Sequence, residues 1–390
     1  MTKNIYRLKQ KIQRRCGVAR RDKNISVIIN KTAAFIILLI MTLFLVMTAA
    51  GGAEGENPEI SFSAVMDGSL FRALEERFTL SFVQRNLWLS SKAKIESQIC
   101  EKVVNGVYIG DDMLLGAEVL SSPSYTSNAD AVNRFSAKND SAVYFVAVPT
   151  SSGVYSEILP EYLTGKTEKQ CIDSVYSKLN SGIRRIDAYN ILKRLNENYI
   201  YFRSDSKWTS YGAYCVYRTV IQKLGFQPSA YDKYTIEHVT DNFRGNLWKK
   251  SQYMKSKPDI LDIYNYNDGA ELLSCTGTDN SHKVRRKELY NRDAVDTDDM
   301  YSLYLGEDMP LVQINTSVNN ERKLLVIKDD FADCFIPFLI QHYSVIDIFS
   351  PECAEGKITD FVNIGDYEQI LFLFGTDSLG SENIFSPLAD

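Results

Sequence analysis

Histidine is scarce in this chain, whose 390 residues include only His238, His282 and His342. They stand far apart, without the short spacings that zinc ligands show, so we expect no metal site and no bound cofactor. The seven cysteines include no CxxC pair, and the sequence contains no internal repeat or low-complexity tract. A basic excess is also lacking, because the net charge is −5, so the composition gives no reason to expect nucleic acid as a partner.

The rest of the composition is that of a globular protein. Hydrophobic residues make up 45% of the chain and charged residues 24%, which excludes disordered and collagen-like classes. The length allows one large domain or two ordinary ones, with a sizeable buried core.

The modest net charge conceals an uneven distribution. Residues 1–32 carry ten basic residues and one acidic residue, a net charge of +9, whereas the remaining chain carries 34 basic and 48 acidic residues, a net charge of −14. Between the two regimes, residues 33–52 (AAFIILLIMTLFLVMTAAGG) contain no charge. About 20 apolar residues suffice to cross a bilayer as a helix, and the basic side stays in the cytoplasm. We therefore expect a cytoplasmic tail at 1–32, a transmembrane signal anchor at 33–52 and an extracytoplasmic domain at 53–390, which makes the bilayer itself a partner.

A cleaved signal peptide is the alternative interpretation of this segment. Small residues at 48–53 would suit a cleavage site. The apolar run is longer than the roughly 7–15 residues of a signal-peptide core, and a tail of more than thirty residues precedes it. Both features favour an uncleaved single-pass anchor in the cell membrane.

The cysteines divide between the two sides of the expected span. Cys16 falls in the tail, and the outer domain holds six: Cys100, Cys171, Cys215, Cys275, Cys334 and Cys353. An oxidising compartment permits disulfides, but the spacings are wide and irregular, so no pairing follows and at most one or two bridges are expected.

Strand and helix patterns alternate along the outer domain. A helical periodicity runs from Leu70 to about Glu101. Beyond it, strands are expected at 142–148, 183–188, 324–327, 344–349 and 369–374, and helices at 167–179, 208–224 and 332–341. Gly225 is expected to end the 208–224 helix as its C-cap residue. This alternation predicts an α/β fold in three layers, α/β/α, around a parallel sheet. The polar segment of about 241–319 is expected to be a solvated insertion or lid.

Two loops could carry chemistry, because ligands of open α/β sheets bind beyond the carboxyl ends of strands. Asp205 stands just before the 208–224 helix, and Asp330 lies between the strand at 324–327 and the next helix. The simpler interpretation is that each aspartate caps a helix N-terminus. A divalent-cation site, or acid/base work by Asp205, Asp329 and Asp330, is a further alternative that the spacing does not single out.

Several stretches of the outer domain resemble the DHHW family of bacterial envelope proteins, and through it the SGNH-hydrolase-like domains of AlgX/AlgJ-type alginate O-acetylation proteins. The matching stretches follow the family's order at 107–115, 147–160, 201–214, 243–251, 324–343 and 369–374. The most specific of them is the pattern D-x-x-W-T-x-x-G-A, formed by Asp205, Trp208, Thr209, Gly212 and Ala213.

The resemblance implies a Ser–His–Asp arrangement that transfers an acetyl group to an envelope polysaccharide, often with a polytopic membrane acyltransferase as partner. Asp205 takes the position of the orienting aspartate. Trp208, Gly245 and Asn246 lie in matching stretches and are assigned to substrate binding. In such a triad histidine removes the serine proton, aspartate orients the imidazole, and backbone N–H groups stabilise the oxyanion.

Two of the three catalytic positions depart from the family pattern. Lys207 stands at the histidine position and Asp330 at the serine position. A lysine with its usual pKa near 10.4 is protonated at neutral pH and cannot serve as a general base, and a carboxylate would occupy the oxyanion hole. We expect a Lys207–Asp330 ion pair in place of the Ser–His contact, with Nζ within about 6 Å of the carboxylate. The neighbouring Ser204 and Ser206 have no histidine near them in sequence to activate them.

Three functions remain open from sequence. The first is a catalytically degenerate SGNH-like domain that binds an envelope glycan or supports an acetylation complex. The second is an active polysaccharide O-acetyltransferase or acetylesterase whose catalytic groups lie elsewhere. The third is a non-enzymatic interaction module of the same fold.

Overall fold

The computed structural model describes Leu39, Thr42 and residues 102–117, 124–163 and 167–389. The chain divides into two compact units, Met1–Ser91 and Lys92–Asp390, and residues 102–117, 124–163 and 167–389 belong to the second. The expected anchor at 33–52, apart from Leu39 and Thr42, and the expected helix at 70–101 lie outside the described residues. Within the described residues, no helix is both long and apolar enough to cross a membrane.

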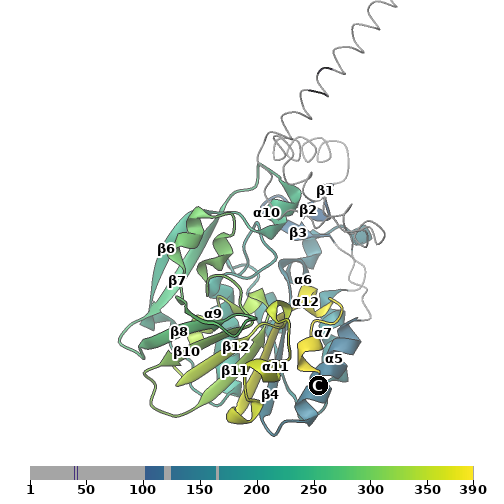
Figure 1. The fold of residues 1–390 in the computed structure, drawn as a ribbon. Helices are drawn as coiled ribbons and strands as arrows, with labels where there is room; N and C mark the ends of the chain where they lie inside the picture. Colours follow the sequence, from purple (N-terminus) through teal and green to yellow (C-terminus); the bar gives the residue numbers. More distant parts are fainter. Residues whose placement is uncertain (1–38, 40–41, 43–101, 118–123, 164–166, 390) are drawn as a thin grey trace, which may run out of the picture. The chain divides into compact units, whose positions relative to one another are not determined.

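An eight-stranded sheet forms the centre of this unit (Figure 1). Its strands are β4 (Ala142–Val148), β5 (Arg184–Asp187), β8 (Leu272–Thr278), β9 (Val284–Arg286), β10 (Leu311–Thr316), β11 (Lys323–Lys328), β12 (Val345–Phe349) and β13 (Gln369–Gly375). The spatial order is β5-β4-β13-β11-β12-β10-β8-β9. All five strands expected from sequence are present. Four of them are short apolar runs of the kind that a buried sheet requires, whereas the edge strand β5 buries only Ile186.

The sheet is mixed, so the expectation of a parallel sheet was wrong. The five strands from β5 to β12 are parallel, whereas β10, β8 and β9 add to one edge in antiparallel pairing. These three strands come from residues 272–316, within the segment 241–319 that was expected to be an insertion or lid. β8 and β9 are mostly exposed or half-buried, and in β10 the buried residues are interrupted by the half-buried Gln313 and Asn315. None of the three therefore shows the continuous apolar run by which a buried strand is recognised.

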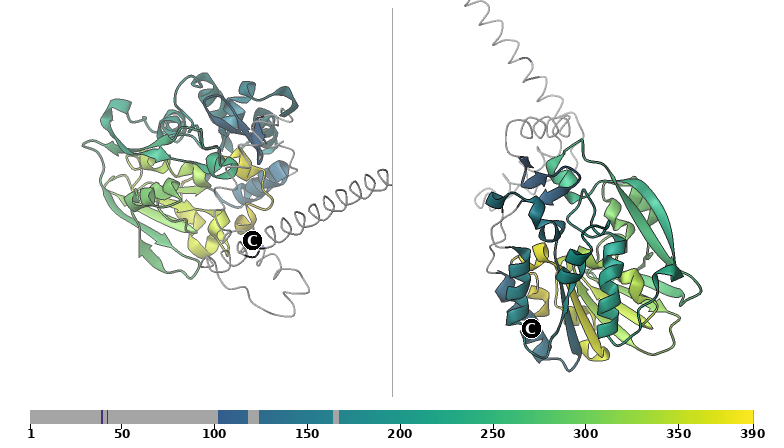
Figure 2. Two further views of the ribbon diagram at one scale, coloured as in Figure 1. Left: turned by 90° about the horizontal axis from the view of Figure 1, so that it is seen from above. Right: turned by 180° about the vertical axis from the view of Figure 1, so that it is seen from behind.

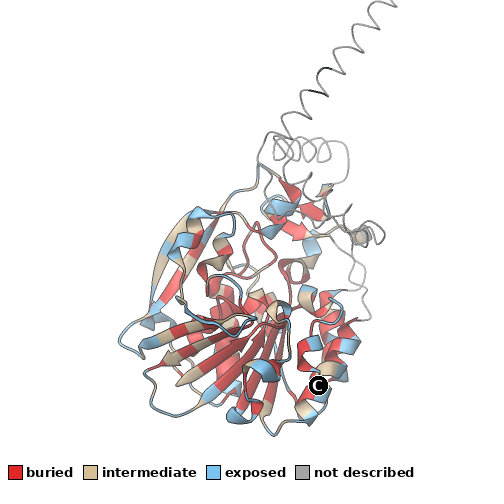
Figure 3. Ribbon diagram, in the orientation of Figure 1, coloured by how far each residue is buried: buried red, intermediate tan, exposed pale blue. Residues whose placement is uncertain are grey.

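Apolar side chains leave the sheet on both faces and build two separate cores, which gives three layers (Figure 2). Even-numbered β4 residues such as Tyr144 and Val146 pack towards α8 (Ala188–Arg194) and α9 (Ser210–Lys223). Odd-numbered residues such as Phe145 pack towards α5 (Ser124–Ala137) and α7 (Glu168–Lys178). The central strands are accordingly buried along their length (Figure 3).

Smaller elements surround these layers. The short helices are α6 (Ser151–Val154), α10 (Asn246–Ser251), α11 (Ile358–Phe361) and α12 (Thr376–Leu379). A three-stranded sheet of β1 (Val103–Val104), β2 (Val107–Ile109) and β3 (Leu114–Gly116) shares a small apolar cluster with α10. An antiparallel ribbon of β6 (Tyr234–Phe243) and β7 (Asp259–Tyr266) contributes Tyr234 and Leu261 to the α9 core.

The expected helix at 208–224 is present as α9, whereas the expected helix at 332–341 is not formed. α9 begins after Thr209, whose hydroxyl accepts the Gly212 N–H, and Gly225 follows its last turn with φ of +92°. Residues 332–341, expected to form a helix, instead form 3-10 turns, of which the second spans Ile336–Leu339. Pro337 lacks an N–H and cannot continue an α-helical ladder, which explains the shorter turns.

No disulfide joins any two of the five described cysteines, which are Cys171, Cys215, Cys275, Cys334 and Cys353.

Candidate functional site

Loops from separate parts of the chain meet at the carboxyl ends of β4 and β11. The Ser151 N–H, just beyond β4, donates to the Ser206 carbonyl at 2.9 Å. The Trp208 indole N–H donates to the Phe331 carbonyl, just beyond β11, at 2.7 Å. Trp208 is fully buried and lies against Phe331 and Phe335, so the loop of residues 204–208 is fixed to the sheet edge. Its side chain is therefore a core anchor of the site, and the expected substrate contact stays a prediction.

Asp205 is buried and accepts backbone N–H groups through both carboxylate oxygens. Oδ1 accepts from the Lys207 N–H at 3.0 Å, and Oδ2 accepts from the Asn246 N–H at 2.7 Å. Only 2% of the residue is exposed. The two bonds compensate for the loss of water around the charge and fix the side chain's direction.

Gly245 allows α10 to approach Asp205 this closely. A Cβ atom at position 245 would lie 2.3 Å from Cβ and from Oδ2 of Asp205. Any larger residue would push away the Asn246 N–H that binds the carboxylate. The Asn246 amide is itself engaged, since its Oδ1 accepts the Ser206 N–H at 3.2 Å and its Nδ2 donates to the Ser206 hydroxyl at 3.1 Å. Gly245 and Asn246 thus position Asp205 and Ser206, and their part in substrate binding stays a prediction.

Lys207 lies between the two carboxylates of the site. Its Nζ is 3.8 Å from Asp205 Oδ1 and 3.8 Å from Asp330 Oδ2, and 4.7 Å from the centre of the Tyr301 ring. The lysine side chain is 12% exposed. Burial alone lowers the pKa of Lys207, but Asp205 and Asp330 together outweigh it and raise the pKa above its usual value. Lys207 is therefore an ammonium at neutral pH and holds no lone pair for proton abstraction.

Asp330 and its neighbour Asp329 have different surroundings. The buried Asp329 carboxylate accepts the Phe331 N–H at 3.1 Å and the Gly375 N–H at 2.7 Å, which ties the end of β11 to the end of β13. Burial raises the pKa of Asp329. The Asp330 side chain is half exposed and meets Lys207. Asp329 thus has a structural role, and Asp330 is the residue presented at the site.

Three further residues of the site gave no signal in the sequence. Asp259 is fully buried at the start of β7 and accepts the Ser204 N–H at 2.9 Å, the Ser204 hydroxyl at 2.5 Å and the Tyr199 hydroxyl at 2.6 Å. Glu168 accepts the Thr150 N–H at 2.7 Å and the Thr376 hydroxyl, and so connects the loops that follow β4 and β13. Tyr301 comes from the segment 241–319. Their partners are distant in sequence, so no local spacing marks them.

The three histidines are all engaged elsewhere. Nε2 of His342 lies 2.6 Å from the Tyr217 hydroxyl, and Nδ1 of His238 lies 2.5 Å from Asp262 Oδ1. The His282 ring lies against Phe361. His342 precedes β12, at the end of the parallel strands opposite Asp330. Ser204 and Ser206, the alternative nucleophiles, donate or accept hydrogen bonds with Asp259 and Asn246 and have no imidazole partner among the described residues.

An acidic cluster beside the site already contains its counter-charge. Carboxylate oxygens of Asp308, Asp330 and Asp333 lie within 4.8 Å of one another. The buried Lys328 ammonium is 2.6 Å from Asp333 and 3.8 Å from Asp308. In the expected trio of Asp205, Asp329 and Asp330, the first two carboxylates already accept backbone N–H groups. Neither arrangement presents the open oxygen cage that a hard cation prefers.

Comparison with known proteins assigns the chain to a family. The family described as DHHW protein matches residues 121–349. A DHHW family protein from Eubacterium siraeum is similar in structure, with a TM-score of 0.63 at 24% identity, covering 73% of this chain and 95% of that one. Bacillus cereus PatB1, also solved with a sulfonyl adduct, gives a TM-score of 0.61 at 21% identity, covering 72% and 98%. The O-acetyltransferase domain of Pseudomonas putida AlgJ gives a TM-score of 0.44 at 11% identity, covering 72% and 95%. No curated protein sequence matches the chain.

Proposed function

This chain belongs to the DHHW family, and we propose that it is a membrane-anchored, extracytoplasmic member that has lost acyl-transfer chemistry and serves polysaccharide acetylation as a binding or accessory protein. The observation that carries the proposal is the Lys207–Asp330 pair, with 3.8 Å between Nζ and Oδ2. The sequence resemblance assigns these two groups to the positions where the family motif has histidine and serine.

The chemistry of acyl transfer explains why this pair opposes catalysis. A nucleophilic hydroxyl must lose its proton to a neighbouring base, and the developing oxyanion must meet N–H donors. An ammonium whose pKa is raised cannot accept the proton. A carboxylate at position 330 offers no hydroxyl and repels a developing negative charge. The buried Asp205, still held by two N–H groups, supports the view that the scaffold of the site has been retained.

The proposal assigns the anchor and the partners as follows. Residues 33–52 hold the domain at the outer face of the cell membrane, where a polytopic membrane acyltransferase and an envelope polysaccharide are the partners that the family resemblance implies. A site that keeps its loop geometry but lacks the reacting groups could still bind the polysaccharide that accepts the acetyl group, or could support a separate, active enzyme. The alternative of an active acetyltransferase or acetylesterase requires a nucleophile other than position 330.

Restoring the two missing groups tests the proposal. The full chain, in detergent, is treated with a sulfonyl fluoride and followed by intact mass, alongside Lys207→His, Asp330→Ser and the double variant. We expect a single sulfonyl adduct only in the double variant, because only there can an imidazole activate a serine. Hydrolysis of p-nitrophenyl acetate should rise in the double variant at least about 100-fold above the unmodified chain, the lower range of general-base catalysis.

The unmodified chain provides the decisive comparison. Ester turnover by it that Asp205→Ala abolishes would show an active enzyme and refute the loss of chemistry. Binding to a glycan array by the inactive chain would support the polysaccharide role, and its absence would favour a protein-interaction module.

A further inference from the structure

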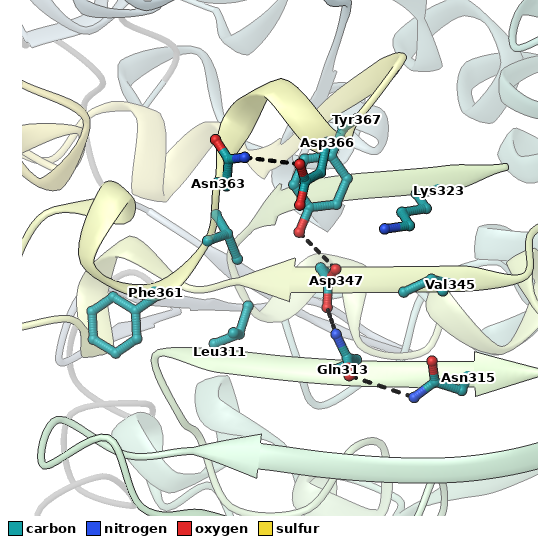
Figure 4. A pocket seen from close by; sticks show the side chains of 11 residues that line it. Leu311, Gln313, Asn315, Lys323, Val345, Asp347, Phe361, Asn363, Asp366 and Tyr367 are labelled. Carbon is teal, nitrogen blue, oxygen red and sulfur yellow. Dashed lines mark hydrogen bonds between the residues drawn. The ribbon is translucent and has the colours of Figure 1, made fainter. Parts of the chain in front are cut away.

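A polar pocket of about 350 Å³ lies on the sheet face that carries the α5 and α7 core, away from the candidate site (Figure 4). Its floor comes from β10, β11 and β12, and residues 361–367 form a wall. Lys323 opens β11 on the pocket side, and Lys328 closes it next to Asp330. Five strand residues at about 3.3 Å each separate the two places by roughly 17 Å. The pocket is therefore a different site from the one that holds Lys207.

The floor interrupts the apolar pattern of this sheet face. Towards one end of β10, β11 and β12 the face carries apolar residues, among them Leu311 and Ile327, which belong to the buried core. Towards the other end it carries Gln313 and Asn315 from β10, Lys323 from β11 and Asp347 from β12. Four polar side chains thus stand on three neighbouring strands where the same face is otherwise apolar.

Asp347 lies at the centre of this floor with little exposure. The residue is 3% exposed, and its carboxylate accepts the Tyr367 hydroxyl at 2.6 Å and a Gln313 amide N–H at 2.8 Å. Burial raises the pKa of Asp347, while the two hydrogen bonds and Lys323 oppose the rise. Each carboxylate oxygen accepts one of these bonds and has lone-pair capacity for another. A buried carboxylate disfavours folding compared with an apolar residue, so its presence points to a role other than stability.

The pocket offers donors and acceptors side by side. The Lys323 ammonium forms no ion pair with any described residue of the chain, so its three N–H donors face the pocket mouth or solvent. Asn315 donates one N–H to the Ser274 hydroxyl at 2.9 Å, and its carbonyl oxygen is left as an acceptor. The chain of hydrogen bonds from Asn315 through Gln313 to Asp347 fixes the orientation of all three groups (Figure 4).

We propose that this pocket binds a hydroxyl-rich ligand of monosaccharide size, either as a free sugar or as the end of a glycan chain. Hydroxyl groups both donate and accept, which matches the interleaved amide, carboxylate and ammonium groups. The volume lies at the lower end of the roughly 300–1,000 Å³ of small-molecule sites. The pocket suits an anion or a cation less well. A phosphate would be repelled by the carboxylates of Asp347 and Asp366, and a hard cation would be repelled by the Lys323 ammonium. The proposal stands independently of acyl-transfer activity, because it uses none of the same residues.

Ligand-observed NMR and calorimetry on the full chain test the proposal. The probes are glucose, mannose, N-acetylglucosamine and glucuronate, with a short oligosaccharide of each to separate free from chain-end recognition. Three further probes serve as controls. Cyclohexanol tests whether a ring of similar size with one hydroxyl binds, glycine tests whether a zwitterion binds, and inorganic phosphate tests whether an anion binds. We expect saturable binding of at least one sugar with a dissociation constant in the millimolar range or below.

Variants then locate the binding. Asp347→Asn and Lys323→Ala should each weaken the affinity about tenfold or more. The matched control Asp241→Asn removes a carboxylate on the exposed β6 ribbon and should leave the affinity unchanged. Lys323 is exposed, so Lys323→Ala keeps the fold, as thermal melting should verify, even where Asp347→Asn disturbs it.

Three results would overturn the proposal. They are the absence of sugar binding up to roughly 50 mM, well above the weakest affinity expected, binding of glycine or phosphate alone, and sugar binding that both pocket variants leave unchanged. Sulfonyl-adduct formation in the Lys207→His/Asp330→Ser protein is unaffected by any of them, so failure here is distinguishable from failure of the proposed function.

Discussion

A single residue, Lys207, supplies the positive charge opposite the two carboxylates of the candidate site. Its ammonium contacts two carboxylates at 3.8 Å and an aromatic ring at 4.7 Å, and little of it reaches water. Asp205 is buried, so removal of the ammonium would leave an anion without its counter-charge. The sequence gives the identities of these groups, but their energies depend on burial that only the fold determines.

Lys207→Ala should lower the free energy of unfolding by about 2 kcal/mol. A fully buried pair would lose about 3–5 kcal/mol, and the loss is smaller here because Asp330 is half exposed and Asp205 keeps two N–H bonds. The measurement is equilibrium denaturation in urea at neutral pH.

Lys169→Ala is the matched control. Lys169 and Asp173 form an ion pair on α7 with 2.5 Å between Nζ and Oδ1. This pair is shorter than the Lys207 pairs but exposed to water, so its loss should lower the free energy of unfolding by only about 0–1 kcal/mol. Equal effects of the two substitutions would show that the Lys207 pair behaves as a surface pair.

Packing between α9 and the turn Ile336–Leu339 shows how elements constrain a titratable group. The hydroxyl of Tyr217, on α9, accepts the Ser229 N–H at 2.9 Å and lies 2.6 Å from His342 Nε2. Burial lowers the pKa of His342 to about 4, and the residue is 7% exposed.

Stability should fall as the pH drops from about 6.5 towards 4. In this window the unfolded chain protonates His342 and the folded chain does not, so the unfolded state binds more protons. The contribution approaches 1.4 kcal/mol per pH unit in the middle of the window. Urea denaturation at several pH values measures it.

His342→Gln should flatten the dependence, because glutamine does not titrate. Carboxylates titrate in the same range, so the difference between the curves of the unmodified chain and the variant isolates His342. Parallel curves for the two proteins would contradict the assignment.

The uneven charge distribution belongs to the scale of the whole molecule. Residues 1–32 carry a net charge of +9, residues 33–52 carry none, and the chain beyond residue 32 carries −14. This distribution predicts a single-pass orientation with the N-terminal tail in the cytoplasm. In such an arrangement the basic tail also meets anionic lipid head groups.

The full chain should remain in the membrane fraction after alkaline carbonate extraction. Replacing Leu39 and Leu43 by Arg should release it, since each arginine at a helix centre disfavours insertion by about 2.5–3.5 kcal/mol. Replacing the same residues by Ile is the control and should keep the protein in the membrane.

Sequencing the mature N-terminus separates the two interpretations of residues 33–52. A mature chain that begins near residue 53 would establish a cleaved signal peptide and contradict the anchor. An intact N-terminus with carbonate resistance supports it.

The sequence by itself determined the family, the α/β class and the main strands, because buried strands such as β4 and β13 read as continuous apolar runs and the motif residues follow a fixed order. It also predicted Asp205, Lys207 and Asp330 at the family's motif positions, and the structure brings their side chains together. Only the tertiary structure decided that the sheet is mixed, since β8, β9 and β10 contain polar residues and lack the continuous apolar runs of the central strands. Only the tertiary structure identified Asp259, Glu168, Tyr301 and the pocket around Asp347. Their hydrogen bonds and burial depend on how segments far apart in the chain pack together, and the residues next to them in sequence do not indicate that packing.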